Sequence, residues 1–120
     1  MKYETEITGL GSDALSFLDM DCNFLIIFDD SAPEELAEIS ILHKRSQLRA
    51  TPEKGDTFTI CGISYEISEV GFEVETTLRD LGHCTLSFDG SVAPAPGSIQ
   101  LKGAAPSKEQ IVIGGKIEIS

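Results

Sequence analysis

Residues 57–70 read TFTICGISYEISEV, and this stretch predicts two strands joined by a tight turn. Apolar and polar side chains alternate along Thr57–Cys61 and again along Ile63–Val70, which is the pattern of strands that bury one face. Between them, Cys61-Gly62-Ile63 supplies a glycine where the chain must reverse, so we expect a β-hairpin.

Similar patterns recur on both sides of this hairpin, as alternation or as short runs of β-branched residues. Eight short strands predict a mainly all-β fold, a small barrel or sandwich with one or two short helices. The six further strands are expected at Lys2–Thr8, Asn23–Phe28, Glu38–Arg45, His83–Phe88, Ser98–Lys102 and Lys116–Ile119.

Two segments predict short helices. Ser31-Ala-Pro-Glu34 has the pattern of a capping box with proline in the first turn, so a helix of about two turns should begin there. The second helix should span Glu75–Leu81 and end at Gly82, because glycine readily adopts the left-handed conformation that closes a helix. Asp89-Gly90 should end the strand before it, and Ser91–Gly97 should form a surface loop.

Length and composition limit the range of functions. The 120 residues fit a single domain, 1–120, and no apolar run approaches the roughly 18 to 20 residues that span a bilayer. No apolar secretory core follows the N-terminus, so we expect a cytoplasmic protein without direct membrane insertion. The net charge of −11 argues against binding to nucleic acid or to anionic membranes.

The three cysteines, Cys22, Cys61 and Cys84, are far apart and lie in apolar surroundings. This spacing fits reduced thiols packed in a core better than a disulfide framework.

His43 is one of only two histidines and lies in the one basic cluster of this acidic chain. Four of the nine Lys/Arg residues, Lys44, Arg45, Arg49 and Lys54, follow it within eleven positions. A neutral imidazole surrounded by fixed positive charge is suited to carry a phosphoryl group. Alternation places His43 beside Ile39 and Ile41 and on the face opposite Lys44, so the ring should be partly desolvated. A solvated strand end with an ordinary imidazole is the alternative interpretation.

His83 begins a strand whose alternation places it on the polar face with Thr85 and Ser87. If the two histidines converge, one ring can act as nucleophile while the other donates a hydrogen bond to the phosphoryl oxygens. An exposed or structurally hydrogen-bonded histidine remains the alternative.

Other chemistries have weaker support. A zinc site made of the two histidines and the cysteines would lack any CxxC, HxH or HExxH spacing. No Gly-x-Ser-x-Gly elbow, GxGxxG motif or P-loop occurs either, so neither a hydrolase triad nor a nucleotide site is indicated.

Residues 77–90 read TLRDLGHCTLSFDG, and with Ala32-Pro33 and Ile41-Leu-His43 this segment resembles the glucitol/sorbitol-specific IIA component of the bacterial sugar phosphotransferase system. The resemblance extends over almost the whole chain. It includes a Thr-rich first strand, an Ala-Pro-Glu-Glu-Leu helix start, Pro52 and Gly55 before the hairpin, and Pro96-Gly97 before a late strand.

The resemblance implies a phosphoryl carrier. Such IIA proteins accept a phosphoryl group on a histidine from the phosphocarrier HPr and pass it to the IIB component, which energises uptake through the IIC channel. The acceptor position falls at His43, and His83 matches a family position as a supporting residue. Arg45 stands where family members can have a second histidine. Arg45 and Lys44 are candidates to stabilise the phosphoryl group, with Lys44 expected to point away from His43.

No cofactor or metal is expected for this reaction. Because two proteins must reach the same ring, we expect a shallow, exposed acceptor with an apolar rim, for which Ile39, Ile41 and Phe72 are candidates. A non-catalytic β-barrel module that binds a ligand is the alternative function, and a zinc-dependent hydrolase is a third. The sequence does not identify the transported sugar or the order of the strands. It also leaves open whether the protein forms a homodimer and whether the barrel closes by exchanging a segment between chains.

Overall fold

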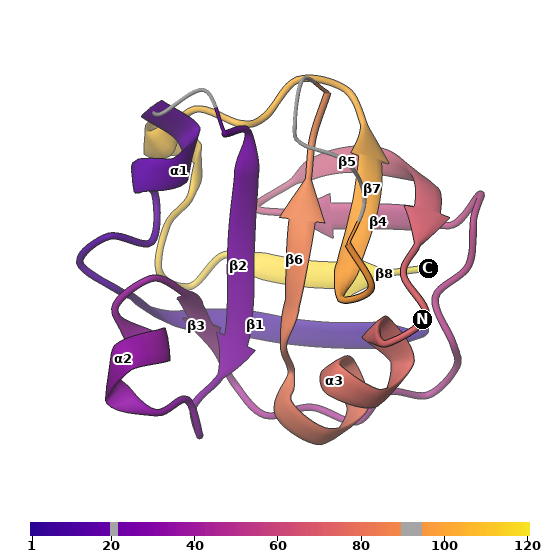
Figure 1. Ribbon diagram of the computed structural model, residues 1–120, viewed down its shortest axis with the longest axis horizontal. Helices are drawn as coiled ribbons and strands as arrows, with labels where there is room; N and C mark the ends of the chain where they lie inside the picture. The colour runs from indigo at the N-terminus through magenta and orange to yellow at the C-terminus, as the bar shows by residue number, and fades with distance from the viewer. Residues whose placement is uncertain (20–21, 90–94) are drawn as a thin grey trace.

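The computed structural model describes residues 1–19, 22–89 and 95–120, and within them eight strands form one closed barrel (Figure 1). Around the barrel, the strands follow the order β1-β3-β2-β6-β7-β5-β4-β8. The prediction of a mainly β barrel with short helices is therefore confirmed. The strands are β1 (Tyr3–Leu10), β2 (Phe24–Asp29), β3 (Ile41–His43), β4 (Thr57–Ile60), β5 (Ile63–Val70), β6 (Cys84–Ser87), β7 (Ser98–Lys102) and β8 (Lys116–Ile119). The helices are α1 (Ser16–Asp19), α2 (Glu34–Ala37), α3 (Val74–Leu81) and the 3₁₀ turn η1 (Lys108–Gln110).

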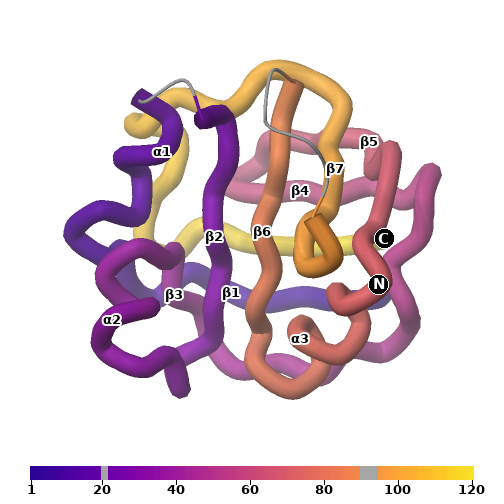
Figure 2. Tube along the Cα trace, viewed as in Figure 1, coloured from indigo at the N-terminus to yellow at the C-terminus, as the bar shows by residue number. Residues whose placement is uncertain are grey.

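The barrel closes within one chain by pairing its two ends. β1 runs antiparallel to β8, with Tyr3 opposite Ile119 and Glu6 opposite Lys116, so the N- and C-termini lie near each other (Figure 2). β2 and β3 are parallel, and α2 lies in the connection between them. β6 and β7 are also parallel.

The hairpin that residues 57–70 predict is present. β4 pairs with β5 in antiparallel register, and only Cys61 and Gly62 connect them. Both have positive φ angles, 49° and 82°, as a two-residue hairpin turn of type I′ requires. The asparagine or glycine usually found at the first turn position is here a cysteine.

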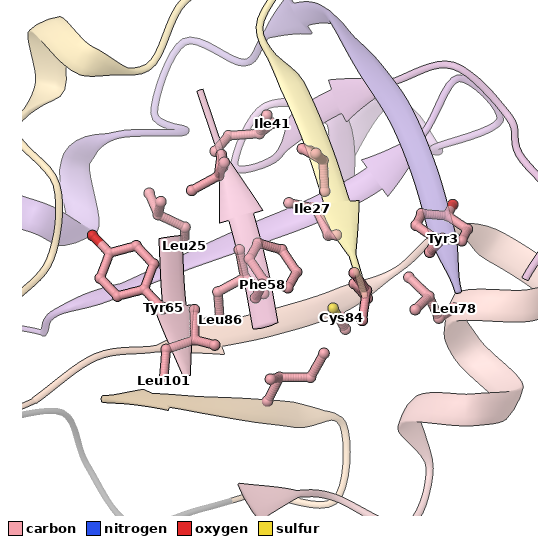
Figure 3. Packing of buried hydrophobic residues seen from close by; sticks show 14 of the residues in the cluster. Tyr3, Leu25, Ile27, Ile41, Phe58, Tyr65, Leu78, Cys84, Leu86 and Leu101 are labelled. Atoms are coloured by element: carbon pink, nitrogen blue, oxygen red, sulfur yellow. The ribbon is translucent and has the colours of Figure 1, made fainter. Parts of the chain in front are cut away.

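Inward-facing side chains from all eight strands fill the barrel (Figure 3). Leu25 and Ile27 of β2, for example, are fully buried, whereas Ile26 between them is only half-buried. α3 lies against one end of the barrel and buries Val74 and Leu78. β2 ends and β6 begins at this same end, so the turn from α3 into β6 lies close to the barrel interior (Figure 1).

β3 is shorter than the predicted Glu38–Arg45 strand. α2 ends at Ala37 with Glu38 as its C-cap, and the backbone N–H groups of Ile39 and Ser40 still donate to carbonyls of α2. These turn-like hydrogen bonds use the groups that a strand ladder would need, so pairing begins only at Ile41.

The predicted capping box at Ser31 is wrong. Pro33 is the N-cap of α2, the helix has a single turn, and the Ser31 side chain hydrogen-bonds the Asp29 carboxylate instead. The second predicted helix is confirmed as α3, which begins at Val74 and ends at Gly82 in the left-handed conformation.

Several smaller expectations have mixed outcomes. Sequence patterns did not indicate α1 or η1. Cys84 is buried as predicted, but Cys22 and Cys61 are only half-buried. The Asp89-Gly90 turn and the Ser91–Gly97 loop fall largely on residues 90–94, outside the described residues.

Candidate functional site

His43 is the last residue of β3 and points into the barrel, with 0% of its surface exposed. The expectation of a shallow, exposed acceptor is therefore wrong for this conformation. Inward-facing Ile41 precedes it by two residues on the same face, as strand alternation predicts. The loop after β3 and the turn after α3 complete the burial, because the backbone of each contacts the ring.

Both ring nitrogens of His43 face backbone carbonyl oxygens. Nδ1 lies 2.8 Å from the oxygen of Lys44, and Nε2 lies 2.7 Å from the oxygen of Gly82. A neutral imidazole has one N–H and one lone pair, so it can donate to only one of the two. Donation to both requires the doubly protonated ring, which has no lone pair with which to attack phosphorus.

The two carbonyls that cap His43 differ in the number of hydrogen bonds they accept. The Lys44 oxygen also accepts a hydrogen bond from Thr5 Oγ1 at 2.6 Å, and the Lys44 N–H donates to Glu6 of β1 at 3.0 Å. For the Gly82 oxygen, the described residues offer no hydrogen-bond partner other than the ring. The contact at Nδ1 is therefore anchored to the barrel wall, whereas the contact at Nε2 depends on the turn between α3 and β6.

Gly82 allows that turn to approach the ring. Its φ angle is +60°, and a Cβ built there would lie 2.7 Å from Cε1 of His43 and 2.8 Å from Cβ of Asp29. No real side chain fits in that space without displacing a neighbour. This close approach gives a physical reason for glycine in the Leu81-Gly82-His83 segment beyond its role in ending α3.

Buried polar side chains lie near Tyr3, whose ring contacts the imidazole of His43. The two rings are roughly perpendicular with centroids 6.1 Å apart, and the Tyr3 hydroxyl has no hydrogen-bond partner among the described residues. Burial, and to a lesser extent Cys84 and Asp29, raises the pKa of Tyr3 well above its usual range. Burial also raises the pKa of Cys84 to about 12, so its thiol stays protonated near neutral pH. Figure 3 shows Tyr3 on the side of the core where Leu78 and Cys84 lie.

His83 has a different environment. It is half-buried, and its Nδ1 lies 3.1 Å from the carbonyl oxygen of Ile27, while its ring packs at 4.6 Å on Phe28. Donation from Nδ1 leaves the lone pair on Nε2, which has no partner in the described part of the chain. β6 begins only at Cys84, so the backbone turn rather than strand alternation orients His83.

The structure brings the two histidines to the same end of the barrel through Gly82, whose carbonyl faces His43 and whose next residue is His83. Among the described interactions, no hydrogen bond joins the two rings directly.

The predicted cationic residues have separate surroundings. Lys44 points away from His43, as expected, and lies 3.6 Å from Glu6, which also approaches Lys116 at 3.4 Å. Lys44, followed by Lys116, lowers the pKa of Glu6. Arg45 is exposed and lines a shallow depression of about 470 Å³ with Ser46, Gln47 and Arg79 of α3.

The predicted apolar rim is only partly present. Ile41 is a core residue with no exposed surface, Ile39 is half-buried, and Phe72 is 83% exposed. Phe72 precedes α3, so it remains a candidate contact for a partner.

Sequence reasoning missed Thr5, Gly82 and Arg79 as parts of this region. Gly82 had a local signal, because it lies between Leu81 and His83 in the motif that carried the family resemblance. Arg79 lies in the same motif, but nothing in the sequence indicated that its side chain would lie beside residues 45–47. The Thr5 hydroxyl had no local signal, since only the folded barrel places it against the Lys44 carbonyl. In the described ranges, no group of three His, Cys, Asp or Glu side chains is placed to hold a metal ion. Of the helices in those ranges, none has the length and apolar character needed to cross a membrane.

Comparison with known proteins gives a consistent result. The family model described as PTS system glucitol/sorbitol-specific IIA component matches residues 2–118. The chain is 35% identical over 105 residues to the PTS system glucitol/sorbitol-specific EIIA component of Escherichia coli (strain K12), covering 87% of this chain and 84% of that protein. The protein of the same description from Shigella flexneri matches with the same identity and coverage.

A solved structure supports the fold. The crystal structure of a PTS system IIA component from Enterococcus faecalis V583 matches with a TM-score of 0.76, covering 96% of this chain and 97% of that chain at 22% identity. The family match and the relatives that are 35% identical show more than the fold. The chain belongs to the family of glucitol/sorbitol-specific IIA components of the PTS, and is thus part of a phosphotransferase relay.

Proposed function

We propose that this protein carries a phosphoryl group on His43, accepting it from phospho-HPr and passing it to the IIB component during glucitol/sorbitol uptake through IIC. Membership of the IIA family supports the relay role. The observation that carries the choice of atom is the unequal anchoring of the two carbonyls on the His43 ring.

Nε2 is the nitrogen that attacks phosphorus. Nδ1–H donates to the Lys44 carbonyl, which Thr5 and β1 hold in place, and this fixes the tautomer with the lone pair on Nε2. In that tautomer the lone pair faces the lone pairs of the Gly82 oxygen at 2.7 Å, an unfavourable contact. A neutral His43 therefore favours movement of the Gly82 carbonyl away from the ring.

The transfer step balances without any further reactant. The bond from His43 Nε2 to phosphorus forms while the nitrogen–phosphorus bond of phospho-HPr breaks. The HPr ring, protonated on its other nitrogen, leaves as a neutral imidazole, and the positive ring charge passes to the phosphorylated His43 ring. The phosphorylated His43 ring keeps its Nδ1–H, which continues to donate to Lys44. Transfer to IIB repeats the same exchange with the IIB nucleophile.

Access to the ring requires only a local opening. Gly82 and His83 donate their backbone N–H groups to Leu78 and Thr77 of α3, at 3.0 and 3.2 Å, so the turn moves with the last turn of this helix. The barrel ladder does not have to break, because the Gly82 carbonyl takes no part in it. Motions of such turns occur far faster than global unfolding.

His83 has a supporting role. Its Nδ1–H donates to Ile27 and holds the turn against β2, and a protonated Nε2 can donate to a phosphoryl oxygen. His83 is also the second candidate acceptor, because its ring is partly exposed and its Nε2 has no hydrogen-bond partner among the described residues.

Phosphorylation of variants tests the assignment. Purified protein is incubated with phosphoenolpyruvate, enzyme I and HPr, and intact mass is measured before and after acid treatment. We expect wild type to gain one acid-labile phosphoryl group, His43→Gln to gain none, and His83→Gln to gain it more slowly. Circular dichroism and thermal unfolding of both variants control for loss of fold. Labelling of His43→Gln with none of His83→Gln would move the acceptor to His83.

The same experiment tests the alternative of a non-catalytic ligand-binding module, which predicts no label on wild type. The relay begins with phosphoenolpyruvate, a cytoplasmic metabolite, so we place the protein in the cytoplasm. We also take residues 1–120 as one IIA domain, since pairing of β1 with β8 uses both ends of the chain.

A further inference from the structure

The depression between the β3–β4 loop and α3 has an unusual lining for this protein. Its volume is about 470 Å³, and its lining residues are Arg45, Ser46, Gln47 and Arg79. None of them is acidic, although the chain has 20 Asp and Glu residues against 9 Lys and Arg. Two guanidinium groups therefore share a concave surface without a carboxylate among the lining residues.

Both arginines retain donors for a ligand. Within the described ranges, Arg45 forms neither an ion pair nor a side-chain hydrogen bond. Arg79 uses only Nε, which lies 3.2 Å from the Asp80 carboxylate. The side chains of Arg79 and Asp80 are 53% and 57% exposed, so this ion pair holds the arginine weakly. By contrast, most of the lysines pair with carboxylates, namely Lys2, Lys44, Lys102, Lys108 and Lys116.

The residues that line the depression belong to the two segments whose carbonyls contact the His43 ring. Arg45 follows Lys44, whose carbonyl caps Nδ1, and Arg79 lies on the last turn of α3, whose C-cap carbonyl, Gly82, caps Nε2. The two walls of the depression are thus the two segments that cover His43. Movement of the α3 turn away from the ring would open the depression toward Nε2.

We propose that this depression is an anion subsite for the phosphoryl group, in which Arg45 and Arg79 donate to the phosphoryl oxygens. This inference rests on the proposed phosphoryl transfer to His43 and adds Arg79 to the site. Two planar guanidinium groups can bind the three oxygens from opposite sides, and Gln47 supplies a further N–H donor. Charge on these oxygens changes as one nitrogen–phosphorus bond forms and the other breaks, so the arginines stabilise both transfer steps.

Binding of inorganic phosphate tests the subsite without requiring catalysis. The full chain is titrated with phosphate at constant ionic strength, and the Nε–Hε signals of the arginines are followed by ¹H–¹⁵N NMR. We expect saturable shifts at Arg45 and Arg79, and a loss of affinity of about tenfold in Arg45→Gln and in Arg79→Gln.

Arg49→Gln is the matched control, because Arg49 is an exposed arginine of the same loop that does not line the depression. Its phosphate affinity should stay within about twofold of wild type. Equal losses in all three variants, or no shift at Arg45 and Arg79, would overturn the subsite.

Single-turnover transfer from saturating phospho-HPr separates this proposal from the assignment of His43. We expect Arg79→Gln to form the same phosphohistidine at a maximal rate reduced about tenfold, with Arg49→Gln unchanged. A normal maximal rate in Arg45→Gln and Arg79→Gln would overturn the subsite and leave the phosphohistidine intact. Phosphate binding at the two arginines in a wild type that takes no label would retain the anion site and refute the carrier function.

Discussion

His43 combines full burial with hydrogen bonds at both ring nitrogens, and this combination decides how the residue can act. A buried polar ring without partners would cost free energy. In the proposed tautomer the Lys44 carbonyl satisfies Nδ1–H, whereas the Gly82 carbonyl stabilises the closed conformation only when Nε2 carries a proton. The same carbonyls restrict reactivity, since the nucleophilic nitrogen must lose its partner before it attacks. In the proposed transfer, the closed conformation must therefore lose at least the contact from Nε2 to Gly82 before the ring accepts the phosphoryl group.

Replacement of Gly82 tests that contact. Gly82→Ala places a methyl group 2.7 Å from Cε1 of His43 in a left-handed backbone conformation. The left-handed conformation imposed on alanine should by itself lower the free energy of unfolding by about 1 to 2 kcal/mol. The steric conflict with His43 should lower it further. We expect chemical denaturation to show this loss, the imidazole signals of His43 to shift, and the rate of phosphorylation to change.

Gly114→Ala is the control for Gly82→Ala. Gly114 also has a positive φ, +91°, but a Cβ there has no neighbour within 4 Å. This variant should lose stability while the His43 signals and the phosphorylation rate stay as in wild type. An unchanged His43 environment in Gly82→Ala would mean that the turn does not control the ring.

At the scale of secondary-structure elements, alternation predicted most strands closely because each buries one face of the barrel. β5 and β7 have the predicted bounds, and the β4–β5 turn falls where glycine indicated it. The region from Ser31 to Ser40 was harder to predict, because its backbone and side-chain hydrogen bonds compete with one another. Ser31 binds Asp29 rather than capping α2, and the turn after α2 shortens β3.

The site was predictable only where its residues carry local signals. His43 and His83 stood out through scarcity and motif, and alternation predicted that His43 shares the inward face of Ile41. The carbonyl oxygens of Lys44 and Gly82 could not be predicted, because backbone groups of every residue type look alike in sequence. Arg79 reaches the site only because α3 packs beside the β3–β4 loop.

For the whole molecule, the joining of the chain ends is the feature that holds the barrel closed. Lys2 extends this junction: its ammonium group lies 2.6 Å from Asp56 and 3.0 Å from the Thr51 carbonyl, so it ties the start of β1 to the loop before β4. Partial burial raises the pKa of Asp56, but hydrogen bonds from Lys2 and from the Glu53 backbone outweigh it and leave the pKa below its ordinary value.

This junction should make stability depend on pH. A carboxylate whose pKa is lowered by folding contributes stability above its unfolded pKa of about 3.9, and that contribution is lost as pH falls through the lower folded value. We expect Asp56→Asn to reduce the free energy of unfolding by about 1 kcal/mol at pH 7, with the difference from wild type vanishing in acid.

Denaturant unfolding between pH 2 and 7 measures this effect. In a Lys2→Met background, Asp56→Asn should cause a smaller loss with little dependence on pH, because the charged partner is absent. A difference in stability between wild type and the Asp56→Asn variant that grows on acidification would refute the assignment.

We propose that the phosphoryl group is carried on Nε2 of His43 while Nδ1–H still donates to the Lys44 carbonyl. The most direct measurement is a ¹H–¹⁵N spectrum of the imidazole groups in ¹⁵N-labelled protein, phosphorylated through HPr, with phosphorus–nitrogen coupling resolved. We predict coupling at Nε2 of His43 and a retained proton at its Nδ1. Coupling at either nitrogen of His83, or at Nδ1 of His43, would contradict it.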